Sequence, residues 1–469
     1  MATLLPVELD RSDKTPLSEQ IRKGIATAIR TGVLVPGARL PSWRDLAAQL
    51  GVARGTVRVA YEGLLYDQLI VSSRSAGTHV ATGSPATMPP DTPLDSGLLR
   101  EMFRGDFSSG PAIFQMGVPD QGCFPAKLFA RIRAHAVRAE SDAPANHPDP
   151  RGEFELRRGI AAHLAIARGV ECSPSQIIIT AGFTGALGLT LRVLGLEGRT
   201  AWIEDPCFPL TRRGLEIAGM ILAPVPVDAN GVVVDHGLRH APDAALAIVT
   251  PGQQAPMGST LSLARRIRLL DWAARTQAWI IEDDYLGELQ LKGRAAPALA
   301  SLDRAGRVIH VGSFSKTISP TLRLGFLVAP ASLAGRFAEA AACLAPAPGP
   351  SVQLATAEFL RDGHYMRHLR RAKRVYLNRS TALVDYLTRK RLDAKSAGLA
   401  VLVRLPNGAS DTIIAREAFA YGLGPVPLSP WYMSPRPEHS GLLLGVATVT
   451  AERLAASCDR LHRLIKRFA

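Results

Sequence analysis

Cysteine is scarce in this chain and shows no paired spacing. The 469 residues contain five cysteines, none of them close to another: Cys123, Cys172, Cys207, Cys343 and Cys458. This scatter argues against a disulfide framework and against a zinc site, and it fits a reducing compartment. We therefore expect a cytoplasmic protein that holds no metal ion.

Long apolar runs are also missing. No uninterrupted hydrophobic stretch approaches the roughly 20 residues that a membrane-spanning helix needs. The amino terminus is Met-Ala-Thr-Leu-Leu-Pro-Val-Glu-Leu-Asp, which has no positive flank and only a short apolar run, so it does not resemble a secretory signal. Neither export nor a membrane partner is expected.

Acidic residues are outnumbered, because 41 Asp and Glu stand against 55 Lys and Arg, a formal net charge of +14. Positive surface potential favours a polyanionic partner. The excess is small in residues 1–82, with 10 basic and 7 acidic side chains, and large in residues 361–395, with 11 and 3. The second stretch is either a further DNA-facing surface or, as is more usual for a charge run, a solvated helix face.

The amino-terminal region begins with the pattern of an amphipathic helix. Leu17, Ile21, Ile25 and Ile29 recur every four residues, which places them on one face of a helix that ends near Gly32.

Two more helices and a hairpin follow. Ser42 and Asp45 have capping-box form at the start of the second helix, and the third begins at about Arg54. Short β runs at residues 69–71 and 77–80 predict a hairpin. Residues 1–82 are therefore expected to form a winged helix-turn-helix, whose third helix enters the major groove of DNA.

Residues 83–111 are expected to be a linker. They contain five prolines together with Ser, Thr, Gly and Asp, and show no periodic apolar pattern before Leu98. A partly extended chain of this length spans roughly 30 Å or more, enough to place the first domain on a neighbouring subunit.

From residue 112 to 469 the pattern is α/β. Short apolar runs alternate with helical patterns, and the expected strands are residues 177–180, 201–203, 245–249, 279–281, 308–311 and 324–328. Their continuous hydrophobicity predicts a mostly parallel sheet that is covered on both faces. After about Ser351 the chain becomes helix-rich, with strands at 399–405 and 441–446, which predicts a smaller carboxy-terminal α/β subdomain.

One group of residues has the chemistry that pyridoxal phosphate (PLP) requires. The cofactor's aldehyde needs a lysine, its ring nitrogen a carboxylate, and its phosphate a cation with hydrogen-bond donors. Lys316 follows a predicted strand in Ser-Phe-Ser-Lys and can form the Schiff base. Asp283 ends another strand and can face the ring nitrogen, while Tyr285 can reach the ring hydroxyl.

Other residues suit the phosphate and the ring face. Gly182-Phe-Thr-Gly185 follows a strand and opens a helix, so its backbone N–H groups can cradle an anion. The expected cofactor-binding side chains, besides Asp283 and Tyr285, are Ser313, Ser315 and Arg323 around the lysine, Phe183 and Thr184 at the helix start, and Phe208, a candidate to stack on the ring.

The order Asp283, Tyr285, Lys316 and Arg323 resembles the cofactor signature of fold-type I aminotransferases, over about residues 112–469. The first domain resembles the GntR-type winged helix, through segments such as Gly32-Val-Leu-Val-Pro-Gly-Ala-Arg-Leu-Pro-Ser42. The resemblance implies DNA contact by Arg44, Arg54, Thr56 and Arg58, and by the wing from Arg74 to His79.

Together the two halves resemble the MocR family of regulators. That resemblance implies a PLP-bound, head-to-tail homodimer on two half-sites of a double-stranded DNA operator. It also implies a small amine effector that exchanges with Lys316 to form an external aldimine. Two other hypotheses remain: a working aminotransferase with an accessory DNA-binding domain, and a purely structural second domain in which Lys316 never carries PLP.

Three positions depart from the aminotransferase pattern. The strand at 441–446 contains no arginine, where these enzymes usually clamp a substrate carboxylate. Either another basic residue takes this role, or the effector is an amine without such a carboxylate, for example an ω-amino sulfonate such as taurine or a diamine derivative. Gln253 and His147 replace a histidine and a tyrosine of many relatives, which puts turnover in doubt more than cofactor binding.

Overall fold

The computed structural model describes residues 7, 9–13, 15–73, 77–82, 110–144, 146–291, 293, 295–406 and 408–468. The chain divides into two units, Met1–Asp106 and Phe107–Ala469. The predicted linker lies almost entirely outside the described residues, as does Arg74 of the predicted wing.

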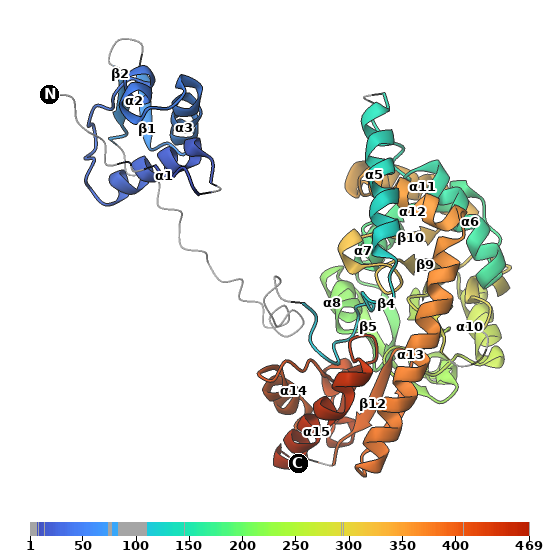
Figure 1. Ribbon diagram of the computed structural model, residues 1–469. Helices are drawn as coiled ribbons and strands as arrows, with labels where there is room; N and C mark the ends of the chain where they lie inside the picture. Colours follow the sequence, from blue (N-terminus) through green and yellow to red (C-terminus); the bar gives the residue numbers. More distant parts are fainter. Residues whose placement is uncertain are drawn as a thin grey trace. The chain divides into compact units, whose positions relative to one another are not determined.

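The first unit has the expected winged-helix elements (Figure 1, blue). They are α1 (Leu17–Arg30), α2 (Trp43–Leu50), α3 (Arg54–Tyr66) and the antiparallel strands β1 (Ile70–Ser73) and β2 (Gly77–Val80). Ser42 caps α2 by accepting a hydrogen bond from the Asp45 backbone N–H at 3.2 Å, as its sequence position predicts. Ile21, Ile25 and Leu64 are fully buried, so the periodic apolar positions form the core.

The second unit is built on an eight-stranded sheet with the order β3-β10-β9-β8-β7-β4-β5-β6. The strands are β3 (Ile177–Thr180), β4 (Thr200–Asp205), β5 (Ile221–Asp228), β6 (Gly231–Val232), β7 (Leu246–Val249), β8 (Trp279–Asp283), β9 (Val308–Ser313) and β10 (Gly325–Val328). The strands β5, β4, β7, β8 and β9 run parallel, while β10 is antiparallel to both of its neighbours and β6 is antiparallel to β5. The predicted mostly parallel sheet is confirmed.

Helices cover both faces of this sheet. In β3, Ile177 and Ile179 pack into one apolar cluster and Ile178 into another, which explains why the strand has no polar alternate positions. One face carries α7 (Gly182–Leu194), α8 (Pro209–Ile217) and α11 (Ala334–Leu344). The opposite face carries α5 (Ala126–Asp142), α6 (Phe154–Arg168), α9 (Val234–His240), α10 (Leu263–Thr276) and α12 (Pro350–Arg361).

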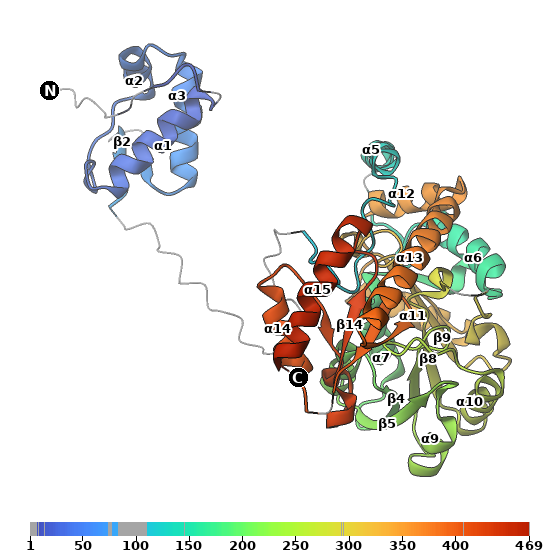
Figure 2. The same cartoon turned by 60° about the horizontal axis from the view of Figure 1, so that its bottom comes forward.

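A small subdomain follows, as predicted. Its antiparallel sheet has the order β11-β12-β14-β13, with β11 (Asp393–Ala397), β12 (Ala400–Arg404), β13 (Val426–Pro427) and β14 (Gly441–Gly445). The helices α14 (Asp411–Phe419) and α15 (Ala451–Phe468) belong to it. The long helix α13 (His364–Arg389) runs from α12 to this sheet (Figures 1 and 2).

None of the helices described here combines the length and the apolar character that crossing a membrane requires.

Candidate cofactor site and DNA-binding face

The expected cofactor residues converge at the carboxyl ends of the parallel strands. Asp283 ends β8, Ser313 ends β9, and the pairing of Asp283 with Val311 places them at one edge of the sheet. Gly325 of β10 pairs with both Ser313 and Thr180, so the start of α7 lies at the same edge. Ligands of α/β proteins bind at such strand ends.

Lys316 lies in the loop after β9 with its side chain partly buried. Its Nζ donates a hydrogen bond to the carbonyl oxygen of Gly117 at 2.9 Å. Burial lowers the pKa of Lys316, and the nearby Asp283 partly opposes this shift. A neutral amine is the form that attacks an aldehyde, so the environment suits a nucleophile.

Gly117 is a site residue that the sequence did not reveal. Its φ of +81° is a left-handed conformation that favours glycine. A Cβ atom at this position would lie 2.9 Å from Lys316 Nζ. The backbone conformation therefore favours glycine here, and a larger residue would also displace the end of the Lys316 side chain.

The carboxyl group of Asp283 has no hydrogen-bond donor among the described residues that would hold its charge. Burial, with the repulsion of Asp284 and Glu204, raises the pKa of Asp283 to about 8. Burial and the nearby Asp283 also raise the pKa of Tyr285. A cationic group placed against Asp283, such as a protonated pyridine nitrogen, would favour its ionised form.

A set of donors suited to a phosphate lies beside the lysine. Arg323, at a left-handed φ of 48°, donates from Nη2 to the Ala181 carbonyl and to Thr184 Oγ1, both at 3.1 Å. The first turn of α7 is therefore joined to an exposed guanidinium. Ser313 Oγ and Ser315 Oγ lie 3.0 Å apart in the lysine loop. Helix N-termini with an adjacent cation bind anions.

The two phenylalanines of the expected site make packing contacts. Phe183 is half-buried against the cluster between the sheet and α7. Phe208 precedes α8 at the end of β4, and its ring centroid lies 5.6 Å from that of Trp431. Their contact with the cofactor stays a prediction.

The residues predicted to contact DNA lie in α2, in α3 and in the hairpin of the first unit. Arg44, Arg54 and Arg58 are exposed, and Thr56 and His79 are partly exposed. Arg44 lies over the Trp43 ring at 4.9 Å, and Arg58 faces Glu62 at 3.5 Å.

Arg39 is a further basic side chain of this face that sequence reasoning did not select. Its backbone forms a bridge with that of His79, and its guanidinium lies beside Gly77. Gly77 and His79 both belong to β2, so Arg39 lies beside the wing.

Comparison with known proteins identifies both units. Residues 17–80 match the model for bacterial regulatory proteins of the gntR family, and residues 114–421 match that for aminotransferase class I and II. The probable rhizopine catabolism regulatory protein MocR of Rhizobium meliloti is 33% identical over 97% of this chain and 94% of its own length. This chain belongs to the MocR class of gntR-family regulators.

Other similarities agree. The pyridoxine biosynthesis transcriptional regulator PdxR of Corynebacterium glutamicum is 34% identical over 82% of this chain and 81% of its own. The α-aminoadipate aminotransferase LysN of Thermus thermophilus, solved with N-(5'-phosphopyridoxyl)-L-leucine, is 27% identical with a TM-score of 0.70, covering 80% of this chain and 95% of that one. The regulator thus couples a DNA-binding domain to an aminotransferase-like domain whose cofactor is PLP, and regulation is favoured over amino-group transfer.

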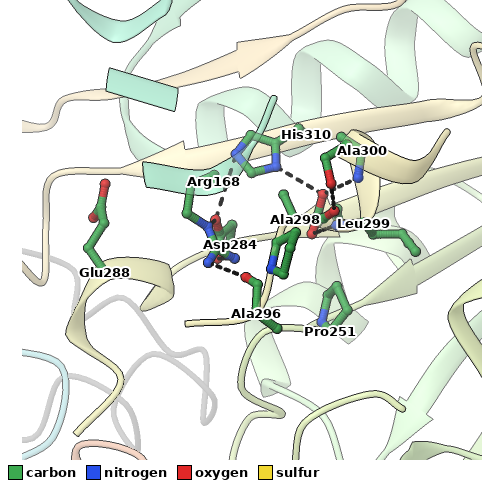
Figure 3. A network of polar contacts seen from close by, with 12 residues as sticks. Arg168, Pro251, Asp284, Glu288, Ala296, Ala298, Leu299, Ala300 and His310 are labelled. Atoms are coloured by element: carbon green, nitrogen blue, oxygen red, sulfur yellow. Dashed lines mark hydrogen bonds and ion pairs between the residues drawn. The ribbon is translucent and has the colours of Figure 1, made fainter. Parts of the chain in front are cut away.

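Beneath the strand ends lies a buried ionic network in the regulator's second unit (Figure 3). Arg168 of α6 donates to both carboxylate oxygens of Asp284, at 2.7 and 3.1 Å. His310 Nδ1 lies 3.0 Å from Glu282, whose oxygens also accept the backbone N–H groups of Leu299 and Ala300. Burial alone would raise the pKa of Glu282 and lower that of His310. The contact between the two groups reverses both effects, so the pKa of Glu282 is lowered and that of His310 is raised.

This network fixes the backbone that carries Asp283. Glu282 and Asp284 flank it in sequence and are both anchored. Sequence reasoning missed these partners because α6 and β9 supply them from distant positions.

Proposed function

We propose that the regulator senses a small amine at Lys316 and responds by changing its affinity for operator DNA. The observation that supports this is the partly buried amine of Lys316, which donates to the Gly117 carbonyl and interacts electrostatically with Asp283. PLP, when bound, would supply an electrophilic aldehyde carbon for which the Lys316 amine and an effector amine are alternative nucleophiles.

The chain's own residues have assigned roles around that chemistry. Asp283 would face the ring nitrogen and Tyr285 the ring hydroxyl, while Phe208 would stack on the ring. Ser313, Ser315, Arg323, Thr184 and the adjacent Phe183 backbone would hold the phosphate. The support is the anion-binding geometry of α7 with Arg323, together with the position of Asp283 at the same sheet edge.

The DNA side of the proposal rests on the first unit. Arg44, Arg54, Thr56 and Arg58, with the wing from Arg74 to His79, would contact an operator. We further propose a cytoplasmic, head-to-tail homodimer that binds two half-sites, with domains at 1–82 and 112–469 joined by the segment 83–111.

The effector is proposed to lack a carboxylate held in the usual aminotransferase manner. All five residues of β14 are glycine or leucine, and all are buried. That strand offers no cation to an α-carboxylate at the usual position, which favours an amine without that group, such as a diamine or an ω-amino sulfonate whose acid group is held elsewhere.

The test is the visible absorption spectrum of the purified protein before and after borohydride reduction. A yellow band that reduction removes, with the cofactor mass left on the peptide containing Lys316, is expected. Addition of taurine or putrescine should then shift the band. A protein that stays colourless with added PLP would refute the sensing mechanism.

A variant separates sensing from DNA binding. Lys316→Ala should keep affinity within about threefold for duplexes selected from a random pool, because Lys316 belongs to the other unit. It should lose the response of that affinity to amines. A full response in Lys316→Ala would contradict the proposal.

A further inference from the structure

The residue after the lysine is held by the first turn of α13. The Thr317 Oγ1 lies 3.1 Å from the Tyr365 hydroxyl oxygen, and the Thr317 carbonyl accepts a hydrogen bond from His368 Nε2 at 2.6 Å. Tyr365 and His368 are three residues apart and so share one face of the helix. All three side chains are buried. The main chain at Lys316 therefore cannot shift without disturbing the start of α13.

A carboxylate orients this contact. The Tyr365 hydroxyl oxygen also lies 3.1 Å from Glu288 Oε2. Burial would raise the pKa of Glu288, but His163 and Tyr365 lower it overall, so the group is an acceptor only. The single phenolic proton is thus directed at Glu288. A small cavity lined by Tyr365, Glu288, His163 and Ser313 lies beside these groups and reaches the lysine loop.

The same helix holds the other group that touches Lys316. The amine donates to Gly117, and three residues later the Asp120 backbone N–H donates to the Tyr376 hydroxyl at 2.8 Å. The Asp120 carboxylate pairs with Arg379 Nη2 at 3.0 Å. Tyr376 lies about three helical turns beyond Tyr365. Thr317, the neighbour of Lys316 in sequence, is therefore bonded to α13 directly, and Gly117, its neighbour in space, is linked to α13 through Asp120.

The far half of α13 is fastened to the small subdomain. Ser380 Oγ lies 3.2 Å from Ser396 Oγ in β11, and Arg379 Nη1 donates to the Ala447 carbonyl at 2.7 Å, two residues after β14. Leu383 and Leu387 are fully buried. Figure 2 shows α13 passing from α12 to the side of β14 and α15.

We propose that α13 carries the state of Lys316 to the small subdomain, with Tyr365 as the positioning residue at its start. Any reaction at Lys316 Nζ changes the hydrogen bond to Gly117, and any shift of the lysine backbone moves Thr317. Both changes reach the same helix. This inference rests on the proposed role of Lys316 and deepens it by naming the element that transmits the signal.

The test uses the PLP-loaded full chain and hydroxylamine, a nucleophile that frees Lys316 whatever the natural effector is. Hydrogen exchange is followed in peptides covering β11 and β12. We expect hydroxylamine to change exchange there by about threefold or more in the unaltered protein. In Tyr365→Phe the visible spectrum should still show the reaction, while the change in β11 and β12 should be clearly reduced, because only the route through Gly117 and Asp120 keeps all its contacts.

Two further variants guard against loss of fold. Thr317→Val should reproduce Tyr365→Phe, and Thr317→Ser, which keeps the hydroxyl, should behave as the unaltered protein. The matched control is Tyr386→Phe, which removes a hydroxyl bonded to Asp459 near the other end of α13. Full transmission in both Tyr365→Phe and Thr317→Val would overturn the inference. Absence of any spectral change with taurine, putrescine or related amines would instead count against the proposed function alone.

Discussion

At the residue scale, the proposed cofactor residue Asp283 lowers the stability of the cofactor-free fold. Asp283 is half-buried, its carboxyl group lies near Asp284 and Glu204, and no hydrogen bond from the described residues compensates its charge. A carboxyl group whose pKa rises from 3.8 to about 8 on folding takes up a proton between these values. The stability of the cofactor-free protein therefore falls as pH rises through that window, and the cost is complete above pH 8.

Asp283→Asn removes this charge and should stabilise the cofactor-free protein by roughly 1–3 kcal/mol near pH 8.5, the usual scale for an uncompensated buried polar group. The gain should vanish near pH 4, because Asp283 is then neutral in the folded state. Urea unfolding at several pH values measures it, and PLP affinity should fall at least about tenfold.

The matched control is Asp271→Asn on α10, because the Asp271 side chain is exposed and its replacement should change the free energy of unfolding by less than about 0.5 kcal/mol. A difference between Asp283→Asn and the unaltered protein that is constant with pH would contradict this account of the buried charge.

At the element scale, α3 is the helix expected in the major groove. Arg54 is the first residue of α3 and is exposed, whereas Arg58 forms an ion pair with Glu62. A phosphate contact contributes about one unit to the salt dependence of binding. The two arginines are thus expected to differ in their effect on DNA affinity.

Arg54→Ala should weaken operator binding and lower the slope of log affinity against log salt by about one. Fluorescence anisotropy over a salt series measures both. Arg30→Ala, an exposed arginine at the end of α1, is the control. An unchanged slope in Arg54→Ala, or an equal change in Arg30→Ala, would remove Arg54 from the DNA interface.

Elements were predicted well where the hydrophobic period is clear. The strand at 177–180 and the capped helix after Ser42 agree with the sequence pattern, because each is specified by neighbouring residues. The strand β5 was missed. It contains Pro224 and Pro226 and has several exposed positions, so it lacks the continuous apolar run of its neighbours.

At the scale of the whole molecule, the proposed homodimer makes a prediction about mass and affinity. Sedimentation should give about twice the 50.2 kDa of one chain at micromolar concentration. A duplex with two half-sites should bind about 10²-fold or more tighter than one with a single half-site, because the second contact becomes intramolecular. A monomer with equal affinity for both duplexes would refute the dimer.

The sequence by itself determined the two-domain composition and the position of the proposed cofactor residues along the chain. Strand periodicity and short motifs place Lys316, Asp283, Tyr285 and Arg323 each at a strand end or in the adjoining loop, where the structure has them. The general α/β class followed from the continuous apolar runs for the same reason.

Only the tertiary structure decided which distant residues hold those groups. Gly117 lies 199 positions from Lys316, and Arg168 lies 116 positions from Asp284. Hydrophobic periodicity indicates which side of a helix or strand is buried, but it does not indicate which distant residue packs against that side. Hydrogen bonds across such separations are fixed by the packing of α6, α13 and the sheet, so they emerged only with the fold.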